Sequence, residues 1–194
     1  MCSRYTIIGT RILAERFGNM EMVPRYNAAP GQYLPIITAD HLLREAIFGI
    51  RGAGGRNRIN ARIEGISQKI PSGLSHCLIP ADGFFEWRGE GVRRQPYYFT
   101  FPQSPIISFA GLYDELRTSF CIVTTTATNP IQHIHPRMPY ILSERGEAEW
   151  IGGSYPEPYN KTIEMIAVDR RVNDPTTPDE PSLIRPAEMT HSWW

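Results

Sequence analysis

The sequence has few cysteines, no excess of charge of either sign and no long apolar run. Its three cysteines, Cys2, Cys77 and Cys121, have neither the number of a disulfide framework nor the spacing of metal ligands, which is typical of a reducing compartment. Cys77 and Cys121 lie in apolar runs, so we expect them to be buried core thiols.

Charge and hydropathy exclude further classes of protein. The 20 Lys and Arg residues balance the 20 Asp and Glu residues, so a nucleic-acid ligand would need a local basic patch. No apolar run reaches the ~18 residues of a membrane span, and no charged segment precedes an apolar stretch as in a signal peptide. We therefore expect a cytoplasmic protein with no membrane partner.

Short β-rich runs separated by Pro and Gly dominate the 194 residues. Strands are predicted at 33–38, 42–50, 76–79, 84–88, 96–101, 106–113, 120–126, 139–142 and 164–168. Helices are predicted at 11–17, 63–70, 130–135 and 144–151, and the Pro-rich tail 173–186 is expected to lie extended on the surface. The pattern indicates one domain, 1–194, of α+β and mainly β type, with curved sheets or a barrel-like core and a few peripheral helices.

Cys2 would carry both a thiol and a free α-amine if Met1 is removed. The amine titrates at roughly 7.7–8.0 and the thiol at about 8.5, so each has a reactive fraction near neutral pH. An aldehyde can condense with the amine to a Schiff base, which the thiol closes into a thiazolidine. Taken alone, a cysteine at position 2 is better explained as an accident of translation, and only the rest of the chain favours the chemistry.

Two polar segments could carry chemistry. Asn60-Ala61-Arg62-Ile63-Glu64 follows a Gly-rich, Arg-rich stretch that could approach phosphates closely or form an ordinary solvated loop. Glu86 is flanked by Phe84, Phe85 and Trp87, so poor solvation should raise its pKa towards the range of an acid–base catalyst. Period-2 alternation equally allows Glu86 to point outward from a strand.

Two further segments are less specific. His135 and Arg137 lie between two prolines that fix the exit from a short helix, and imidazole can move protons near pH 6.5. His133 and His135 lack a third ligand at suitable spacing, so no metal is expected. The segment Asn27-Ala28-Ala29-Pro30-Gly31 is typical of a turn or plain connector.

Six motifs in register together resemble the SOS response-associated peptidase family, and the likeness runs nearly the whole length. They are Cys2-Ser3-Arg4-Tyr5, Arg25-Tyr26-Asn27-Ala28-Ala29-Pro30-Gly31, Asn60-Ala61-Arg62-Ile63-Glu64, Cys77-Leu78-Ile79-Pro80-Ala81-Asp82-Gly83-Phe84-Phe85-Glu86-Trp87, Phe109-Ala110-Gly111-Leu112-Tyr113 and His135-Pro136-Arg137-Met138-Pro139. The resemblance implies a protein that binds abasic sites in single-stranded DNA and shields them through a covalent crosslink, without cofactor or metal.

The resemblance also implies roles for individual residues. Cys2 would form the thiazolidine with the deoxyribose aldehyde, and Asn60 would orient the reacting terminus and the sugar. Glu86 would act as acid–base on the sugar ring and in reversal of the crosslink, and His135 would assist Schiff-base formation and strand-cleaving β-elimination. The residues that would hold backbone phosphates are Arg4, Arg62 and Arg137. A monomer that associates with the nucleoid when bound to DNA is expected.

The sequence departs from the family pattern at three places. Ser3 stands where glycine is usual, Pro136 stands where a polar or acidic residue is more frequent, and the segment 48–58 lacks the tryptophans that help to separate or stack bases. Three other functions stay open: a thiol peptidase that removes its own Met1, an amidohydrolase with an N-terminal cysteine nucleophile, and a single-strand binding module without covalent chemistry.

Overall fold

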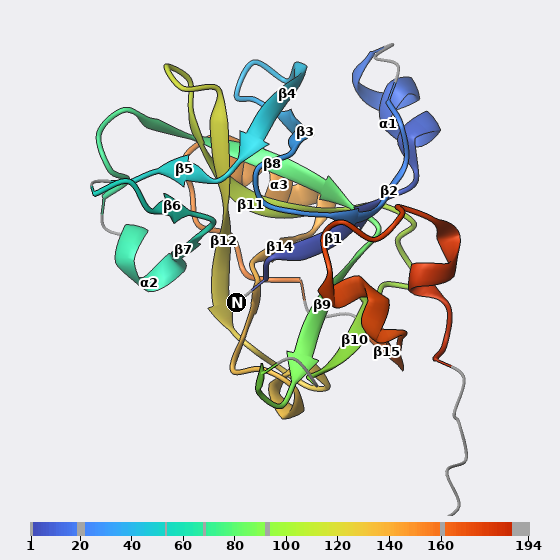
Figure 1. Ribbon diagram of the computed structural model, residues 1–194. Helices are drawn as coiled ribbons and strands as arrows, with labels where there is room; N and C mark the ends of the chain where they lie inside the picture. Colours follow the sequence, from blue (N-terminus) through green and yellow to red (C-terminus); the bar gives the residue numbers. More distant parts are fainter. Residues whose placement is uncertain are drawn as a thin grey trace, which may run out of the picture.

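The protein is built around a closed five-stranded barrel (Figure 1). The computed structural model describes residues 2–18, 22–52, 54–67, 69–91, 94–159 and 162–187. Each barrel strand pairs with the next, and the ring closes because β12 pairs with both β4 and β11. In ring order the strands are β12 (Ser119–Thr126), β4 (Leu43–Phe48), β3 (Tyr33–Ile37), β8 (Leu74–Ala81) and β11 (Ile107–Asp114).

Both faces of the long barrel strands are apolar because both are covered. Along β12, Phe120 and Ile122 pack into one core cluster, while Cys121 and Val123 pack into another that includes Trp150. Trp150 belongs to α3 (Glu144–Ile151), and its indole N–H donates to the carbonyl of Cys77 at 3.0 Å. Strands covered on two faces appear in the sequence as continuous apolar runs, which is why 106–113 and 120–126 were predictable.

Short strands extend the barrel at its rim. β7 (Asn60–Arg62) runs parallel to β12, and β13 (Arg137–Pro139) pairs antiparallel with the same strand. β14 (Ile141–Leu142) pairs with β11, while β5 (Ile50–Arg51) and β6 (Asn57–Arg58) form a separate hairpin. Because β7 and β13 both join β12, two of the polar motifs lie beside each other.

A second, antiparallel sheet continues from the end of β8. Its order is β15 (Glu164–Ala167), β10 (Gln95–Thr100), β9 (Gly83–Arg88), β1 (Arg4–Ile7) and β2 (Arg25–Ala28). Gly83 is required where the chain enters this sheet, since a Cβ there would lie 2.5 Å from the Phe99 carbonyl oxygen. The adjacent Asp82 carboxylate accepts the N–H groups of Ile8 and Gly9 and so fixes the chain between β1 and α1 (Thr10–Phe17).

The remaining helical segments are short and cover the rims of the two sheets. They are α2 (Ile63–Ile66) and the 3₁₀ helices η2 (Ile131–His133), η3 (Arg170–Asn173) and η4 (Pro181–Ile184). η3 and η4 correct the expectation of an extended tail, because Val172 and Leu183 are buried and anchor it as turns.

The fold class predicted from the sequence is confirmed. All nine expected strands are present with shifted ends, but 42–50 is divided at Gly49, whose φ is +124°, and 139–142 is divided between β13 and β14. The strands β1, β2, β6 and β7 were missed, since each is only two to four residues long and all four carry arginine. Within the described part of the chain no helix is long and apolar enough to cross a membrane.

Candidate active site

Cys2 and Asn60 meet where the second sheet reaches the rim of the barrel. β7 places Asn60 opposite Ile122 of β12, and the Asn60 side-chain amide donates to the carbonyl oxygen of Cys2 at 2.9 Å. The other side-chain atom of Asn60, Oδ1, is buried and has no hydrogen-bond partner among the described residues. Asn60 therefore fixes the backbone of Cys2 and keeps an acceptor available beside it.

The thiol of Cys2 is fully buried. Its Sγ contacts the Arg4 carbonyl oxygen at 3.8 Å. Burial is the main cause, and the nearby charge of Glu86 the second, of a thiol pKa that is raised well above its ordinary value. A thiol in this position stays protonated until a base removes its proton. Cys77 and Cys121 are also buried, as expected, and lie in the barrel wall.

Glu86 is a buried acid on the central strand β9. Only 1 % of the residue is exposed, and burial raises the pKa of its carboxyl to about 7. It does not point into solvent, because both faces of β9 are covered: Phe85 and Trp87 pack on one side with Val172 of η3. The alternating pattern correctly placed Glu86 on the face of β9 opposite Phe85 and Trp87. That face, however, is buried as well.

His135 lies next to Glu86 at the end of η2. Its Nδ1 is 3.9 Å from Glu86 Oε2 and 3.1 Å from the backbone nitrogen of Arg137. Burial lowers the pKa of the imidazole below its ordinary value. A carboxyl with a raised pKa beside an imidazole with a lowered pKa gives a proton donor and a proton acceptor that both function near neutral pH.

Arg4 is held inside the protein. Its residue is 8 % exposed, and Nη1 donates to Asn27 Oδ1 at 2.8 Å and to the Val172 carbonyl oxygen at 3.0 Å. Burial lowers the pKa of the Arg4 guanidinium, and the group donates hydrogen bonds to these two acceptors. The expected turn is present at residues 30 and 31, whereas Asn27 lies buried in β2 and positions Arg4. The role of Arg4 in phosphate binding stays a prediction.

Arg62 and Arg137 differ in their surroundings. Arg62 is exposed at the end of β7 and makes no side-chain hydrogen bond or ion pair with the described residues. Arg137 binds Glu64 through two contacts of 2.7 and 2.9 Å and the Thr124 carbonyl oxygen at 2.7 Å, while its buried Nε has no partner among the described residues. Glu64 was missed as part of this arrangement, although it belongs to the same motif as Asn60 and Arg62.

Two of the departures from the family pattern differ in exposure. Pro136 is exposed, and its carbonyl accepts the N–H of Ala127 at 3.0 Å. Phe48 is buried and stacks on Phe120 with ring centroids 5.1 Å apart.

The described His, Cys, Asp and Glu residues form no group of three that could hold a metal ion.

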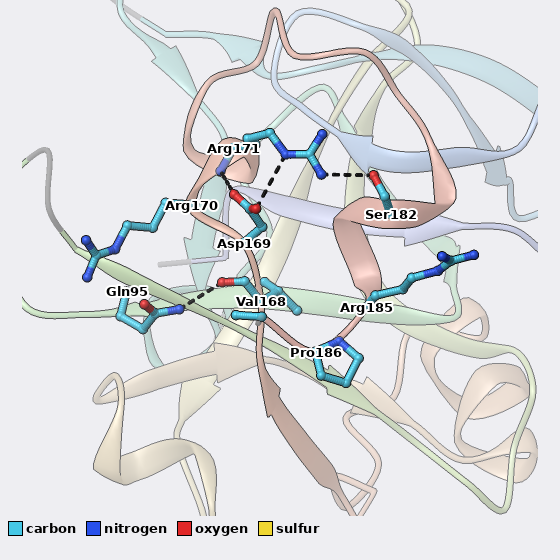
Figure 2. Close-up of a pocket in the computed structure, with 9 residues that line it drawn as sticks. Gln95, Val168, Asp169, Arg170, Arg171, Ser182, Arg185 and Pro186 are labelled. Atoms are coloured by element: carbon cyan, nitrogen blue, oxygen red, sulfur yellow. Dashed lines mark hydrogen bonds and ion pairs between the residues drawn. The ribbon is translucent and has the colours of Figure 1, made fainter. Parts of the chain in front are cut away.

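A pocket of about 600 Å³ lies outside this site, against the second sheet (Figure 2). It opens between the start of β10, η3 and η4, and none of the seven predicted site residues lines it. The residues with polar side chains around it are Gln95, Asp169, Arg170, Arg171, Ser182 and Arg185.

Comparison with known proteins gives a family and a fold. Residues 1–175 match the model of the SOS response associated peptidase family. The chain is 30% identical to the abasic site processing protein YoqW of Bacillus subtilis, over 95% of this chain and 99% of that protein. It is also 30% identical to the abasic site processing protein YedK of Escherichia coli, over 78% and 79% of the two chains. A crystal structure of a Bacteroides thetaiotaomicron protein has the same fold, with a TM-score of 0.69 at 23% identity over 95% of this chain and 92% of that one.

Proposed function

The chain belongs to the SOS response associated peptidase family, and from this premise we propose that it attaches itself covalently to abasic sites in single-stranded DNA through Cys2. The observation that carries the proposal is the position of Cys2. Its backbone is fixed by Asn60, and its thiol lies within the electrostatic influence of the buried acid Glu86. An amino-terminal cysteine held beside an acid–base pair is what an aldehyde trap requires.

The reaction needs no oxidant and releases one water molecule. The α-amine of Cys2, free once Met1 is removed, attacks the aldehyde carbon of the ring-opened deoxyribose, and loss of hydroxide with a proton leaves an imine. The thiol then adds to the imine carbon, its proton moves to the nitrogen, and a five-membered thiazolidine closes. Each step moves one proton, so a neighbouring donor and acceptor accelerate it.

Glu86 and His135 share the proton transfers in this scheme. Glu86, with a pKa of about 7, is half protonated near neutral pH and donates to the departing oxygen. His135, 3.9 Å from Glu86 and held neutral by burial, accepts a proton from the amine or from the C2 position during β-elimination. Reversal of the crosslink uses the same transfers in the opposite order.

The arginines bind the strand on either side of the lesion. Arg62 is exposed without a partner among the described residues, so its guanidinium is available for a phosphate. Arg137 exchanges its contacts with Glu64 for a phosphate. A neutral protein can hold one strand this way because a single groove lined by arginine is sufficient.

Burial of the Cys2 thiol disfavours the amidohydrolase alternative, which acts on external amides. An enzyme that hydrolyses external amides needs an exposed thiolate, whereas this thiol is buried with a raised pKa.

The test is denaturing electrophoresis of the protein with single-stranded DNA that carries one abasic site. A DNA–protein band that survives SDS is expected for the wild type and is expected to be absent for Cys2→Ala. The control is the same strand with a tetrahydrofuran analogue, which has the abasic shape but no aldehyde. A surviving band with Cys2→Ala, or with the analogue, would contradict the proposed chemistry.

A further inference from the structure

The pocket between β10, η3 and η4 has a rigid frame. Gln95 at the start of β10 donates to the Val168 carbonyl oxygen at 2.8 Å. Arg171 of η3 donates to Ser182 Oγ of η4 at 3.1 Å, and the buried side chains of Val172 and Leu183 anchor the two turns. The walls of the pocket are therefore held by side chains rather than by loose loops (Figure 2).

The charges around this pocket do not cancel. Asp169 and Glu180 share Arg171, which lies 3.5 Å from Asp169 and 3.0 Å from Glu180, so with Arg170 and Arg185 three arginines face two acids. Arg170 and Arg185 are exposed, and their side chains make no hydrogen bond or ion pair with the described residues. Figure 2 shows them on opposite sides of the pocket, with their guanidinium groups pointing away from each other. Three arginines against two acids make the surroundings of this pocket locally basic in a chain without net charge.

η3 connects this pocket to the candidate active site. Val172, which follows Arg171 in η3, accepts a hydrogen bond from Arg4 at 3.0 Å. Arg94 directly precedes Gln95, and its guanidinium carbon lies 4.7 Å from the centre of the Trp87 ring, next to Glu86 in sequence. Arginines are thus placed from Arg4 past Arg94 to the mouth of the pocket.

We propose that this pocket binds backbone phosphates of the same single strand, outside the lesion, with Arg170 and Arg185 as the phosphate contacts. The inference rests on the proposed function, because it assumes that the strand passes Arg4 as it enters the active site. Guanidinium groups bind phosphate through paired hydrogen bonds, and each neutralised phosphate releases counterions. A pocket rim with two unpaired guanidinium groups and no net acidic charge is suited to a polyanion that runs across it.

The test measures binding of aldehyde-free strands, so that no covalent chemistry enters it. Fluorescence anisotropy is recorded for the wild type and Arg170→Ala/Arg185→Ala with tetrahydrofuran-containing strands of about 20 and about five nucleotides, a range set by single-strand site sizes. The double variant is expected to bind the long strand about tenfold more weakly, with a log–log salt slope smaller by about 1.4 for two lost phosphate contacts. Its affinity for the short strand should equal that of the wild type.

Two further variants make the result specific. Arg11→Ala/Arg145→Ala removes the same charge from helices α1 and α3, where both side chains are more than 90% exposed, and should leave both affinities unchanged. Arg170→Lys/Arg185→Lys retains the charge and should recover most of the salt slope. Thermal unfolding of each variant checks that the frame is intact.

Three outcomes would overturn the inference. They are an unchanged affinity for the long strand, an equal loss on the short strand, and a deoxynucleoside monophosphate that competes through these arginines as strongly as the long strand. Failure of the proposed function is a separate result, since it would appear as a missing crosslink with authentic abasic DNA while these binding curves stayed the same.

Discussion

Replacing Glu86 by glutamine should change how the stability of the protein depends on pH. The folded carboxyl has a pKa of about 7 against an ordinary value of 4.5, because burial disfavours its charged form. Between these two values the folded state binds more protons than the unfolded state, so the free energy of unfolding falls as pH rises from about 4.5 to about 7. Glutamine has the same shape and cannot titrate.

The size of the effect follows from the two pKa values. A difference of about two and a half pH units corresponds to roughly 3 kcal/mol of lost stability above pH 7. The free energy of unfolding of Glu86→Gln should therefore exceed that of the wild type by an amount that grows between pH 5 and 7 and reaches on the order of 3 kcal/mol. At higher pH this difference should stay constant. At the lowest pH, where the wild-type carboxyl is protonated in both states, the two proteins should be similar.

Urea unfolding at four pH values from about 5 to about 8 measures this difference, using the linear dependence of unfolding free energy on denaturant. Glu115→Gln is the matched control, because this glutamate is exposed beside the turn that joins β11 to β12. It shows how replacing an exposed glutamate alters unfolding over the same pH range. A Glu86→Gln difference that is independent of pH would refute the reasoning, because Glu86 would then ionise as a solvated carboxyl.

Three further changes test single contacts. Arg62→Ala should weaken single-strand binding and reduce the log–log salt slope by about 0.7, measured by anisotropy titration, and an unchanged slope would remove Arg62 from the interface. His135→Ala should slow initial crosslinking about 100-fold or more while Cys2 stays reactive in unfolded protein, and a wild-type rate would make His135 structural. Asn27→Ala should lower the free energy of unfolding by about 1–3 kcal/mol, because it removes a buried partner of Arg4, and a neutral result in urea unfolding would contradict this assignment.

The parts of the fold that could be predicted from the sequence are those with local signals. α3 occupies 144–151 as predicted, because Ser143 caps it by accepting the N–H of Gly146 and two glycines follow its end. The barrel strands were visible as apolar runs because the sheet is covered on both faces. These strands could be predicted without any knowledge of the site.

The parts that could not be predicted depend on contacts between distant segments. β1 and β7 are short and polar, and they are strands only because β9 and β12 supply pairing partners. The ion pair of Arg137 with Glu64 joins positions 73 residues apart, so neither residue signals the other locally. Glu86 lies on the face of β9 opposite the one that η3 covers, beside Cys2 and His135, which come from distant parts of the chain. The alternating sequence pattern predicts the face of the strand to which the Glu86 side chain points, but not which distant segments cover that face.

The central claim is that one carbon of the sugar is bonded to both the nitrogen and the sulfur of Cys2. Mass spectrometry of the crosslinked protein after nuclease digestion tests it most directly. The account predicts an amino-terminal peptide that begins at Cys2, lacks Met1 and carries the sugar remnant with loss of one water, stable without reduction. Cys2→Ser, which keeps the amine but not the thiol, should give an adduct only after borohydride reduction. A stable remnant on any other residue, or on a chain that retains Met1, would contradict the account.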